Sequence, residues 1–570
     1  MERRVFIAVL LSFVVLYTYQ TYFSPPPKAP TSSSTPAASS AAGTAPAGTA
    51  PAAEAPAAPT APAASEPEAV SVLGDSQARE ITVDTPTARI VFTNRGAQVL
   101  HWELKNYRDT ATEMVDLVPS DVPDTQPRPF SLLTDNPRDT ARLNSALYRV
   151  TGDTGGVLDV TKTSVPLVFE FQDENGLAVR KEFQFDAASY TLTATISARR
   201  GTTPINPAIQ WGPGLGDKGA ASGGGSIFTG NAVAPPRVLL HRGGKVERLT
   251  PDKAAETPVQ QGPFRFVGVD DHYFVAFAVN DLNGSAEFTP LTLPGENKTS
   301  RRLLAYTLKP STPAQPIRFY VGPKQFDELQ RLGPDFVRAI DFGTFAWLVV
   351  PLLGTLKWLY RFTGNYGWSI ILLTIIINIV MFPLRHKSSV SMRKMQAIQP
   401  EMKKIQDRYA HLKMTDPGRQ KMQEEVSALY KERGVNPAAG CVPMLLTLPV
   451  LWAFYSLLSQ SIELRGAPFA GWIMDLSGRD PFYVLPALMG ITMFWQQKVT
   501  PTSADPAQQR VMMVMPVMFT VMMAASASGV VLYWFVSQVW AIGQQYLTNW
   551  IVGPLPGLAK APAPAARRAK

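Results

Sequence analysis

The 570-residue chain has a single cysteine, Cys441, and only five histidines. One cysteine excludes an intramolecular disulfide and any metal cluster held by several thiolates. Charged residues make up only 17% of the chain, whereas hydrophobic residues make up 45%. The sequence also lacks a phosphate-binding loop, an H-E-x-x-H motif and any spacing typical of metal ligands. We therefore expect no enzyme activity, no cofactor and no bound metal.

Two weaker chemical signals have simpler explanations. Residues 214–219 spell G-x-G-x-x-G, but no strand-helix-strand pattern surrounds them, so we assign no dinucleotide site. His272 follows Asp270 and Asp271, and a lone histidine with acidic neighbours is usually structural or solvated. The net charge is +9, yet the basic residues lie beside apolar segments. That placement follows the positive-inside rule and does not require nucleic acid as a primary ligand.

The N-terminal part of the chain divides into two segments of different composition. Residues 1–23 begin Met-Glu-Arg-Arg, continue as an apolar run and end among tyrosines and Phe23. We expect a retained membrane anchor that starts in the cytoplasm, with a cleaved signal peptide as the alternative. Residues 24–76 consist almost entirely of Pro, Ala, Ser, Thr and Gly. This composition predicts a disordered, extended linker.

A period-two pattern of apolar residues dominates the next segment. It predicts strands at 89–93, 167–171, 180–185 and 190–196, with further strands at 264–269, 272–279 and 317–321. Asn175-Gly176 predicts a hairpin between the second and third of these strands. The first helix-length amphipathic pattern is at 324–340. We therefore predict an all-β, sandwich-type domain over residues 77–340 that ends in a helix and, given the expected anchor, lies on the far side of the membrane from the cytoplasm.

The C-terminal half carries long apolar runs. Residues 341–363 are interrupted by Pro351, Gly354 and Lys357, which favours an interfacial helix over an additional span. Residues 385–433 contain twelve Lys and Arg against six Asp and Glu, and the tail at 553–570 is also basic. The positive-inside rule therefore predicts six spans with both termini in the cytoplasm. Beyond the anchor, the expected spans are residues 367–384, 440–462, 481–499, 511–527 and 529–552.

The basic segment at 385–434 has helical periodicity. Apolar residues recur at three- and four-residue spacing near 389–410 and 417–433, so we predict a cytoplasmic helical hairpin. Its apolar stripes could simply bury each other, or they could form an adaptable docking platform rich in methionine. The candidate docking residues are Met392, Arg393, Lys394, Met395 and Met402.

Polar residues inside the expected spans are candidate site residues. Asn378 lies in the first core span, and an unpaired amide in hydrocarbon costs several kcal/mol. Thr374 and Phe382 are four residues away on either side, so all three share a helix face. Asn378 either bonds a neighbouring helix or lines a wet cavity. The last span, which includes Tyr533 and Trp534, is also too polar to face only lipid.

Several segments of the chain resemble the YidC-type membrane protein insertases of Gram-negative bacteria. The resemblance is dense from about residue 360 to 550, and elsewhere it is one of layout. The matching segments are Gly364-Asn-Tyr-Gly-Trp-Ser-Ile370, Met381-Phe-Pro-Leu384, Ser391-Met-Arg-Lys-Met395, Gln399-Pro400, Val435-Asn-Pro-Ala-Ala-Gly-Cys441-Val-Pro443, Glu463-Leu-Arg-Gly-Ala-Pro-Phe469, Asp475-Leu-Ser477, Asp480-Pro481, Leu488-Met-Gly490 and Asp505-Pro-Ala-Gln-Gln509.

The resemblance implies a periplasmic β-supersandwich and a five-helix insertase core at 364–552 that encloses a polar groove. Substrates would be nascent membrane proteins, received alone or together with the Sec translocase, and the basic hairpin and tail could meet the ribosome. Thr374, Phe382 and Tyr533 would line the groove, and Trp534 would contact substrate. Segments leaving the groove would pass along the flexible methionines Met515, Met518 and Met522.

One position departs from the family pattern. Asn378 stands where the family groove usually carries a basic residue. Arg385, near the end of the same span, could compensate by reaching into the groove. Whether the groove carries a positive charge therefore depends on where the side chain of Arg385 lies.

Two other classes of protein are alternatives. A secondary transporter would show paired broken helices and internal repeats, and the sequence shows neither. A membrane-anchored periplasmic protein that binds or processes carbohydrate would depend on its β domain. Deletion of most of that domain would then abolish function, whereas an insertase would retain insertion.

Overall fold

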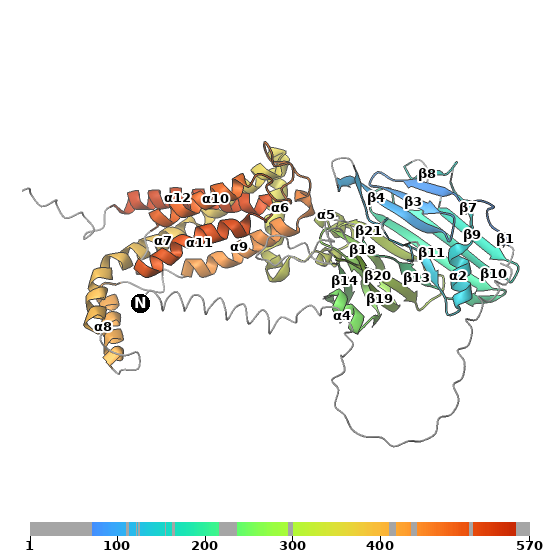
Figure 1. Ribbon diagram of the computed structural model, residues 1–570, viewed down its shortest axis with the longest axis horizontal. Helices are drawn as coiled ribbons and strands as arrows, with labels where there is room; N and C mark the ends of the chain where they lie inside the picture. Colours follow the sequence, from blue (N-terminus) through green and yellow to red (C-terminus); the bar gives the residue numbers. More distant parts are fainter. Residues whose placement is uncertain are drawn as a thin grey trace, which may run out of the picture. The chain divides into compact units, whose positions relative to one another are not determined.

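The computed structural model describes residues 71–553, apart from 110–112, 121, 124–125, 154, 162–165, 216–235, 295–299, 410–417, 435–441 and 501–505. The expected anchor, nearly all of the linker, Cys441, the turn of the basic hairpin and the tail beyond residue 553 lie outside the described residues. Within them, strands predominate up to residue 323 and helices form the chain beyond it (Figure 1).

The described β domain contains one large and two smaller sheets. The large sheet follows the order β1 (Ser71–Leu73), β9 (Leu167–Asp173), β10 (Leu177–Phe185), β11 (Thr191–Arg200), β21 (Ile317–Pro323), β18 (Phe274–Leu282), β17 (Phe264–Asp270), β14 (Arg237–Arg242) and β15 (Lys245–Leu249). Two short strands extend it, since β7 (Arg149–Thr151) pairs with β9 and β12 (Thr203–Ile205) pairs with β11.

Each smaller sheet has five strands in the described residues. One has the order β16 (Val259–Gln261), β19 (Gly284–Pro294), β20 (Ser300–Pro310), β13 (Ala208–Trp211) and β6 (Ser131–Leu133). The other has the order β5 (Met114–Asp116), β4 (Gln98–Arg108), β3 (Ala88–Thr93), β2 (Glu80–Asp84) and β8 (Val157–Asp159). All of their pairings are antiparallel except β2 with β8.

Aromatic side chains fill the space between the sheets. The ring of Phe92 on β3 lies 5.7 Å from that of Phe169 on β9 and 5.0 Å from that of Phe183 on β10. Phe130, just before β6, lies 5.2 Å from Phe319 on β21. These rings are fully or almost fully buried, so burial of apolar area between sheets stabilises the domain. The predicted β-sandwich is therefore confirmed.

The hairpin predicted at Asn175-Gly176 is also confirmed. β9 and β10 pair in antiparallel register on either side of it, and Gly176 has a φ of +74°, which glycine adopts without strain. The prediction of no helix before residue 324 is wrong, because the domain contains α2 (Pro137–Ser145) and the short α4 (Pro251–Glu256). The helix expected at 324–340 is shorter, with α5 at Phe326–Leu332 and a 3-10 turn at Phe336–Ala339.

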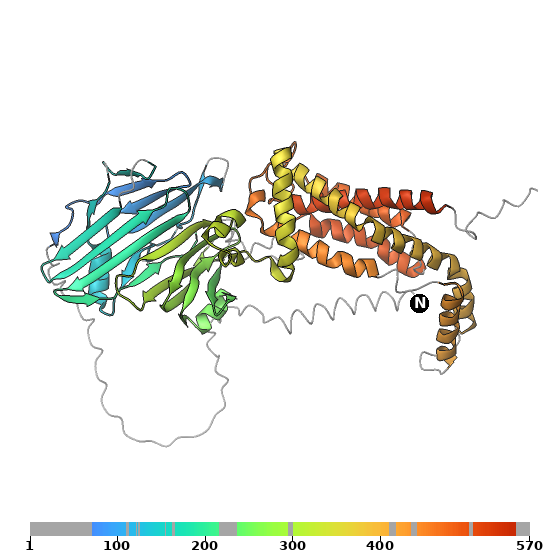
Figure 2. The same ribbon diagram turned by 180° about the vertical axis from the view of Figure 1, so that it is seen from behind.

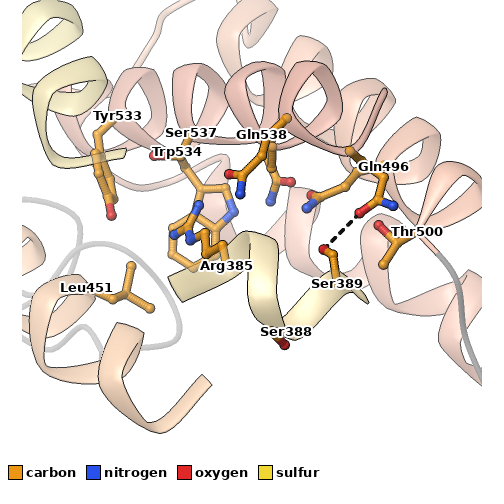
Figure 3. Close-up of a pocket in the computed structure, with 13 residues that line it drawn as sticks. Arg385, Ser388, Ser389, Leu451, Gln496, Thr500, Tyr533, Trp534, Ser537 and Gln538 are labelled. Atoms are coloured by element: carbon orange, nitrogen blue, oxygen red, sulfur yellow. Dashed lines mark hydrogen bonds between the residues drawn. The ribbon is translucent and has the colours of Figure 1, made fainter. Parts of the chain in front are cut away.

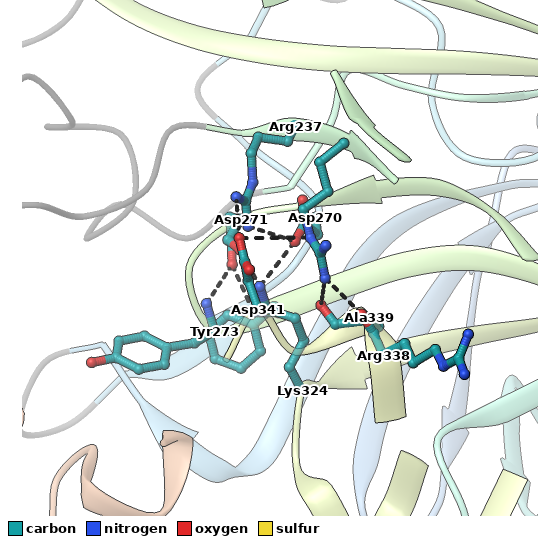
Figure 4. A network of polar contacts seen from close by, with 10 residues as sticks. Arg237, Asp270, Asp271, Tyr273, Lys324, Arg338, Ala339 and Asp341 are labelled. Atoms are coloured by element: carbon teal, nitrogen blue, oxygen red, sulfur yellow. Dashed lines mark hydrogen bonds and ion pairs between the residues drawn. The ribbon is translucent and has the colours of Figure 1, made fainter. Parts of the chain in front are cut away.

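A cluster of charged side chains links the β domain to residues 338–341, which follow its last strand (Figure 4). Arg237 contacts both Asp270, at 3.4 Å, and Asp341, at 3.0 Å. Lys324 contacts Asp270 at 3.0 Å and donates to a main-chain carbonyl at 2.6 Å. Arg248 donates to the main-chain oxygens of residues 338 and 339. Breaking one partner of such a buried set leaves an uncompensated charge.

The helix α6 (Ala346–Thr363) begins directly after the 3-10 turn Gly343–Phe345. One of its faces is buried, through Val349, Leu353, Leu356 and Leu359. Trp347 and Phe362 are 71% and 72% exposed. Lys357 is paired with Asp327 at 2.5 Å and with Glu463 at 3.4 Å. This amphipathic arrangement suits a membrane surface, and the interfacial location stays a prediction.

Six further α-helices follow in the described part of the chain. They are α7 (Tyr366–Arg408), α9 (Val442–Gln460), α10 (Val484–Val499), α11 (Pro506–Met523) and α12 (Ser528–Val552), with α8 (Gly418–Glu432) between α7 and α9 and a 3-10 turn at Ile462–Leu464. α12 packs against α7, α9 and α10. Among the described residues, only α7 combines the length and the sustained hydropathy of a membrane span.

The first span and the first helix of the basic segment are one continuous helix. We expected a core span at 367–384 and a separate helix near 389–410, but α7 runs for 43 residues through Pro383 and Pro400. α8 lies against its C-terminal part (Figures 1 and 2). The contact pairs 401 with 433 and 408 with 425 run in opposite directions, so the two segments are antiparallel.

Candidate functional site

A polar cavity of about 350 Å³ lies among α7, α9, α10 and α12. Most of its lining comes from α12 and α7, and Figure 3 shows the side chains around it. The lining residues are Arg385, Ser388, Ser389, Leu451, Gln496, Thr500, Tyr533, Trp534, Ser537, Gln538, Ala541, Gln544 and Gln545. Most of these residues carry a hydroxyl group or a carboxamide and one carries a guanidinium, while Leu451, Trp534 and Ala541 add apolar surface to the wall.

Arg385 is the only charged residue among these described lining residues. Its Nη1 donates a hydrogen bond to Oδ1 of Asn378 at 2.8 Å. Asn378 is only 3% exposed, and its Nδ2 donates to the main-chain oxygen of Thr374 at 2.8 Å. Seven residues are about two helical turns, so the arginine extends back along its own helix to reach the amide. The hydrogen bond fixes the guanidinium at the cavity wall.

No carboxylate pairs with this guanidinium among the residues that the structure describes. Asn378 supplies one acceptor, whereas a guanidinium carries five N–H donors. A partly buried cation without a counterion costs free energy that an arriving acceptor or anion recovers. The arrangement is therefore suited to contact with carbonyl oxygens or carboxylates that enter the cavity.

α12 presents two aromatic side chains on the wall of the cavity. Tyr533 stacks on Phe454 of α9 with ring centroids 4.1 Å apart. Trp534 contacts Phe519 of α11, with ring centroids 4.7 Å apart. Trp534 therefore lies between the polar cavity and the methionine-rich helix α11.

Two hydrogen bonds join α7 to α12 beside the cavity. His386 Nδ1 lies 3.1 Å from Oγ1 of Thr548, and Ser389 donates to Oε1 of Gln545 at 3.2 Å. The His386 ring also stacks on Phe382 at 5.8 Å. These contacts hold the polar residues of both helices in register.

Some of the residues that the sequence predicted for the site lie in the cavity wall, and others do not. Tyr533, Trp534 and Arg385 line the cavity. Asn378 supports Arg385 from behind, and Thr374 is fully buried and donates to the main-chain oxygen four residues earlier. Phe382 is not among the residues that line it.

The sequence did not identify the contributions from α10. Gln496 and Thr500 line the cavity near the end of that helix. Their polarity within an apolar run was the available signal. It was not sufficient, because their partners lie on other helices.

The candidate docking hairpin is formed by the end of α7 and by α8. Tyr430 donates to the sulfur of Met402 at 3.1 Å, and Arg433 pairs with Glu401 at 2.9 Å. Met392 and Met395 are partly buried, as is Arg393, whereas Lys394 is exposed. The apolar stripes of the hairpin therefore face each other in part, and Lys394, Lys403 and Lys404 lie exposed on its outside, whereas Arg393 does not.

The methionines of α11 differ in exposure. Met515 and Met518 are 51% and 49% exposed, whereas Met522 is partly buried. Two exposed methionines on one helix give a flexible apolar surface.

Two weak chemical signals of the sequence have structural outcomes. His272 is 6% exposed and its Nε2 lies 2.8 Å from the main-chain oxygen of Ser459, so it is a buried structural histidine. The glycine motif at 214–219 lies mostly outside the described residues. No group of three or more His, Cys, Asp or Glu side chains in the described part of the chain is arranged to hold a metal ion.

Comparison with known proteins decides the family. The chain is 35% identical to the membrane protein insertase YidC of Geobacter metallireducens, over 96% of this chain and 98% of that protein. The chain belongs to the YidC family of membrane protein insertases. It is also 36% identical to the YidC of Citrifermentans bemidjiense, over 96% of this chain and 99% of that protein.

Family models divide this YidC-family chain into two parts. The model of the YidC periplasmic domain matches residues 80–354, and the model described as 60Kd inner membrane protein matches residues 358–552. The solved structure of an active YidC insertase with its first transmembrane domain resolved is 17% identical. The match covers 84% of this chain and 94% of the solved chain, with a TM-score of 0.35. The chain thus has the periplasmic β-sandwich domain and the helical core of an inner-membrane family.

Proposed function

We propose that this protein inserts integral inner-membrane proteins into the bilayer and helps them fold, both alone and beside the Sec translocase. The observation that carries the proposal is the polar cavity between apolar helices, in which Arg385 is the only charge among the described lining residues. The relatives that match nearly the full chain are named as membrane protein insertases. An insertase needs a place where the polar part of a substrate leaves water before its apolar part reaches lipid.

The physical work of insertion follows from that cavity. Hydroxyl and carboxamide groups around it replace part of the hydration of a polar substrate segment, which shortens the apolar path that the segment must cross. Burial of the apolar helix that follows supplies the driving force. No nucleotide hydrolysis is required.

Arg385 supplies the cation of this groove in our proposal. By the resemblance to the family, a basic residue is expected where this chain has Asn378. Here the amide accepts a hydrogen bond from a guanidinium anchored two turns later on the same helix. We infer that the charge, carried two turns further along the helix, acts beside the position of Asn378.

A membrane topology completes the proposal. We place six spans across the inner membrane, with both termini and the basic hairpin at 385–434 in the cytoplasm. The excess of Lys and Arg in that hairpin supports this orientation. Exposed lysines such as Lys394, Lys403 and Lys404 would meet the ribosome or an arriving chain.

The exit of substrate into lipid involves α11. Phe519 contacts Trp534 at the cavity wall, and Met515 and Met518 lie exposed on the same helix. An apolar segment that leaves the cavity would pass Trp534 and move along these flexible side chains.

Site-specific photocrosslinking tests the proposal. A photoreactive residue replaces Trp534 or Gln538, both in the cavity wall, while a ribosome-bound single-span protein is presented. Val380 is the matched control, because it is 71% exposed on α7 and is not a lining residue. We expect crosslinks to the nascent chain from 534 and 538 and to lipid from 380. Crosslinks to lipid alone from all three positions would contradict the proposal.

A further inference from the structure

One face of α12 carries more carboxamides than helix packing uses. Trp534, Gln538, Ala541 and Gln545 are spaced by four, three and four residues, so they lie on one face, and all of them line the cavity together with Gln544. Gln544 and Gln545 are only 7% and 6% exposed. Buried carboxamides cost free energy unless they are hydrogen-bonded.

The buried glutamines are not equivalent. Gln545 accepts a hydrogen bond from Ser389 and donates to Asn549, so it joins elements of the core. By contrast, Oε1 of Gln538 and Oε1 of Gln544 are buried and have no hydrogen-bond partner among the described residues. Gln545 has a structural role, whereas Gln538 and Gln544 line the cavity and each carries a carbonyl oxygen that no described residue satisfies.

Unused carbonyl acceptors require N–H or O–H donors. A substrate lysine or arginine could donate, but Arg385 is the fixed charge of the same cavity and repels a second cation. A helix offers few donors, because its main-chain N–H groups are already bonded internally. An extended polypeptide offers one free main-chain N–H per residue whatever its sequence.

We infer that Gln538 and Gln544 accept hydrogen bonds from the main-chain N–H groups of an extended, uncharged segment of the substrate, while Arg385 donates to its carbonyl oxygens. This inference rests on the proposed function and names the chemical group that the site recognises. It explains how one site receives polar segments of unrelated sequence, since every residue except proline carries the same donor and acceptor.

The dimensions of the α12 face set the length of the segment. From residue 534 to residue 545 a helix rises about 16 Å. An extended chain advances about 3.3 Å per residue, so about five residues lie along this face. A translocated segment of about five residues would therefore be held for its whole length, and a longer segment would be held in part.

The decisive test changes the substrate and leaves the protein intact. The probe is a single-span membrane protein with an eight-residue translocated segment of Gly, Ser and Ala. In a second version, five consecutive residues of that segment are α-hydroxy acids, so ester oxygens replace the main-chain N–H groups. We expect proteoliposomes of the full chain to insert the ester version about tenfold more slowly, because each lost hydrogen bond contributes modestly. Equal rates would overturn the inference.

Variants of the protein show whether the glutamines are responsible. In the double variant Gln538→Met and Gln544→Met, the amide version should slow about tenfold and the ester version should slow no further. Gln545→Met is the control, since its loss weakens packing and should leave the ratio between the two substrates unchanged. Additive losses in the double variant would also contradict the inference.

The same substrates separate this inference from the proposed function. Crosslinks from position 534 to both versions, combined with equal insertion rates, would retain the insertase and reject main-chain recognition. An absence of crosslinks to either version would reject the proposed function itself.

Discussion

Arg385 and Asn378 form a hydrogen bond of 2.8 Å between a guanidinium and an amide oxygen on the same helix. The amide is nearly fully buried, and the guanidinium lines the cavity. A neutral side chain thus positions the only charge among the described lining residues. The contribution of the Asn378 amide to insertion can therefore be tested separately from the contribution of the positive charge on Arg385.

Loss of the charge should impair insertion more than loss of the amide. Arg385→Ala removes the cation, and we expect insertion of a single-span substrate to fall about tenfold, the value of one charge-assisted hydrogen bond. Asn378→Ala releases the guanidinium but keeps it near the cavity, so the fall should be about threefold at most. Insertion into proteoliposomes measures both.

A charge relocation provides the control for this comparison. Asn378→Arg in the Arg385→Ala background places a cation at the position of the buried amide, and we expect it to restore most of the lost insertion. Equal defects in the two single variants, together with no restoration, would show that Arg385 does not supply the groove charge.

Close packing at the start of α7 gives a second prediction. A Cβ added at Gly367 would lie 2.0 Å from Cδ2 of Phe469. Because the main-chain oxygen of Phe469 also accepts a hydrogen bond from Asn365, this aromatic residue is held in place. Gly367→Ala should therefore destabilise the protein by about 1–3 kcal/mol. Thermal unfolding of the purified protein measures the effect.

Gly354 is the matched control for this substitution. It lies inside α6, and a Cβ there would meet nothing within 4 Å. Gly354→Ala should be neutral or stabilise by up to about 1 kcal/mol through helix propensity. Similar losses in both variants would mean that contact with Phe469 is not the cause.

Local patterns predicted much of this fold, and contacts between elements escaped prediction. Period-two alternation and Asn175-Gly176 located β9 and β10, because both signals are local. α2 was missed although Asn136 caps its first turn, with Pro137 as its first residue. That signal was brief, and the helix packs on β6.

The same contrast between local patterns and contacts between elements applies to the site. Arg385 was located on the first core span by sequence, but its bond to Asn378 depends on a two-turn reach along the helix. Gln496 could not be assigned, since it joins the cavity only through the packing of α10 on α12. Cavities formed by several helices require tertiary contacts that periodicity does not encode.

A buried ion pair near the connector after α9 gives a third prediction. Glu463 has a side chain that is 6% exposed, and its carboxylate lies 3.4 Å from Lys357 of α6. Burial raises the pKa of Glu463, and the neighbouring ammonium opposes that rise. Lys357→Met should cost about 2–3 kcal/mol, because it leaves a buried carboxylate without its cation.

A double-mutant cycle checks whether the pair is responsible. Glu463→Gln added to Lys357→Met should recover part of the loss, since it removes the uncompensated charge. The free energy of unfolding is measured for the wild type, both single variants and the double variant. Strict additivity would show that the two side chains do not interact.

A fully buried lysine gives a fourth prediction, which concerns the pH dependence of the stability of the β domain. Nζ of Lys181 donates to the main-chain oxygens of Gly96, Ala97 and Phe130 at 2.6, 3.2 and 2.7 Å. No carboxylate among the described residues pairs with it. Burial lowers the pKa of Lys181 from 10.5 to about 7.

The sign of the pH dependence follows from that shift. Below pH 7 both the folded and the unfolded chain hold the proton, so the cost of burying the ammonium is present in full. Between pH 7 and 10.5 only the unfolded chain stays protonated at Lys181, so stability rises with pH, by up to about 1.4 kcal/mol per unit.

The Lys181→Met variant cannot show this rise. Proteolysis of the β domain of the full chain in urea, at pH 7 and pH 9, measures both proteins, and the wild type should gain about 2–3 kcal/mol relative to the variant across that interval. Parallel profiles would mean that Lys181 remains charged in the fold, held by its three carbonyl acceptors.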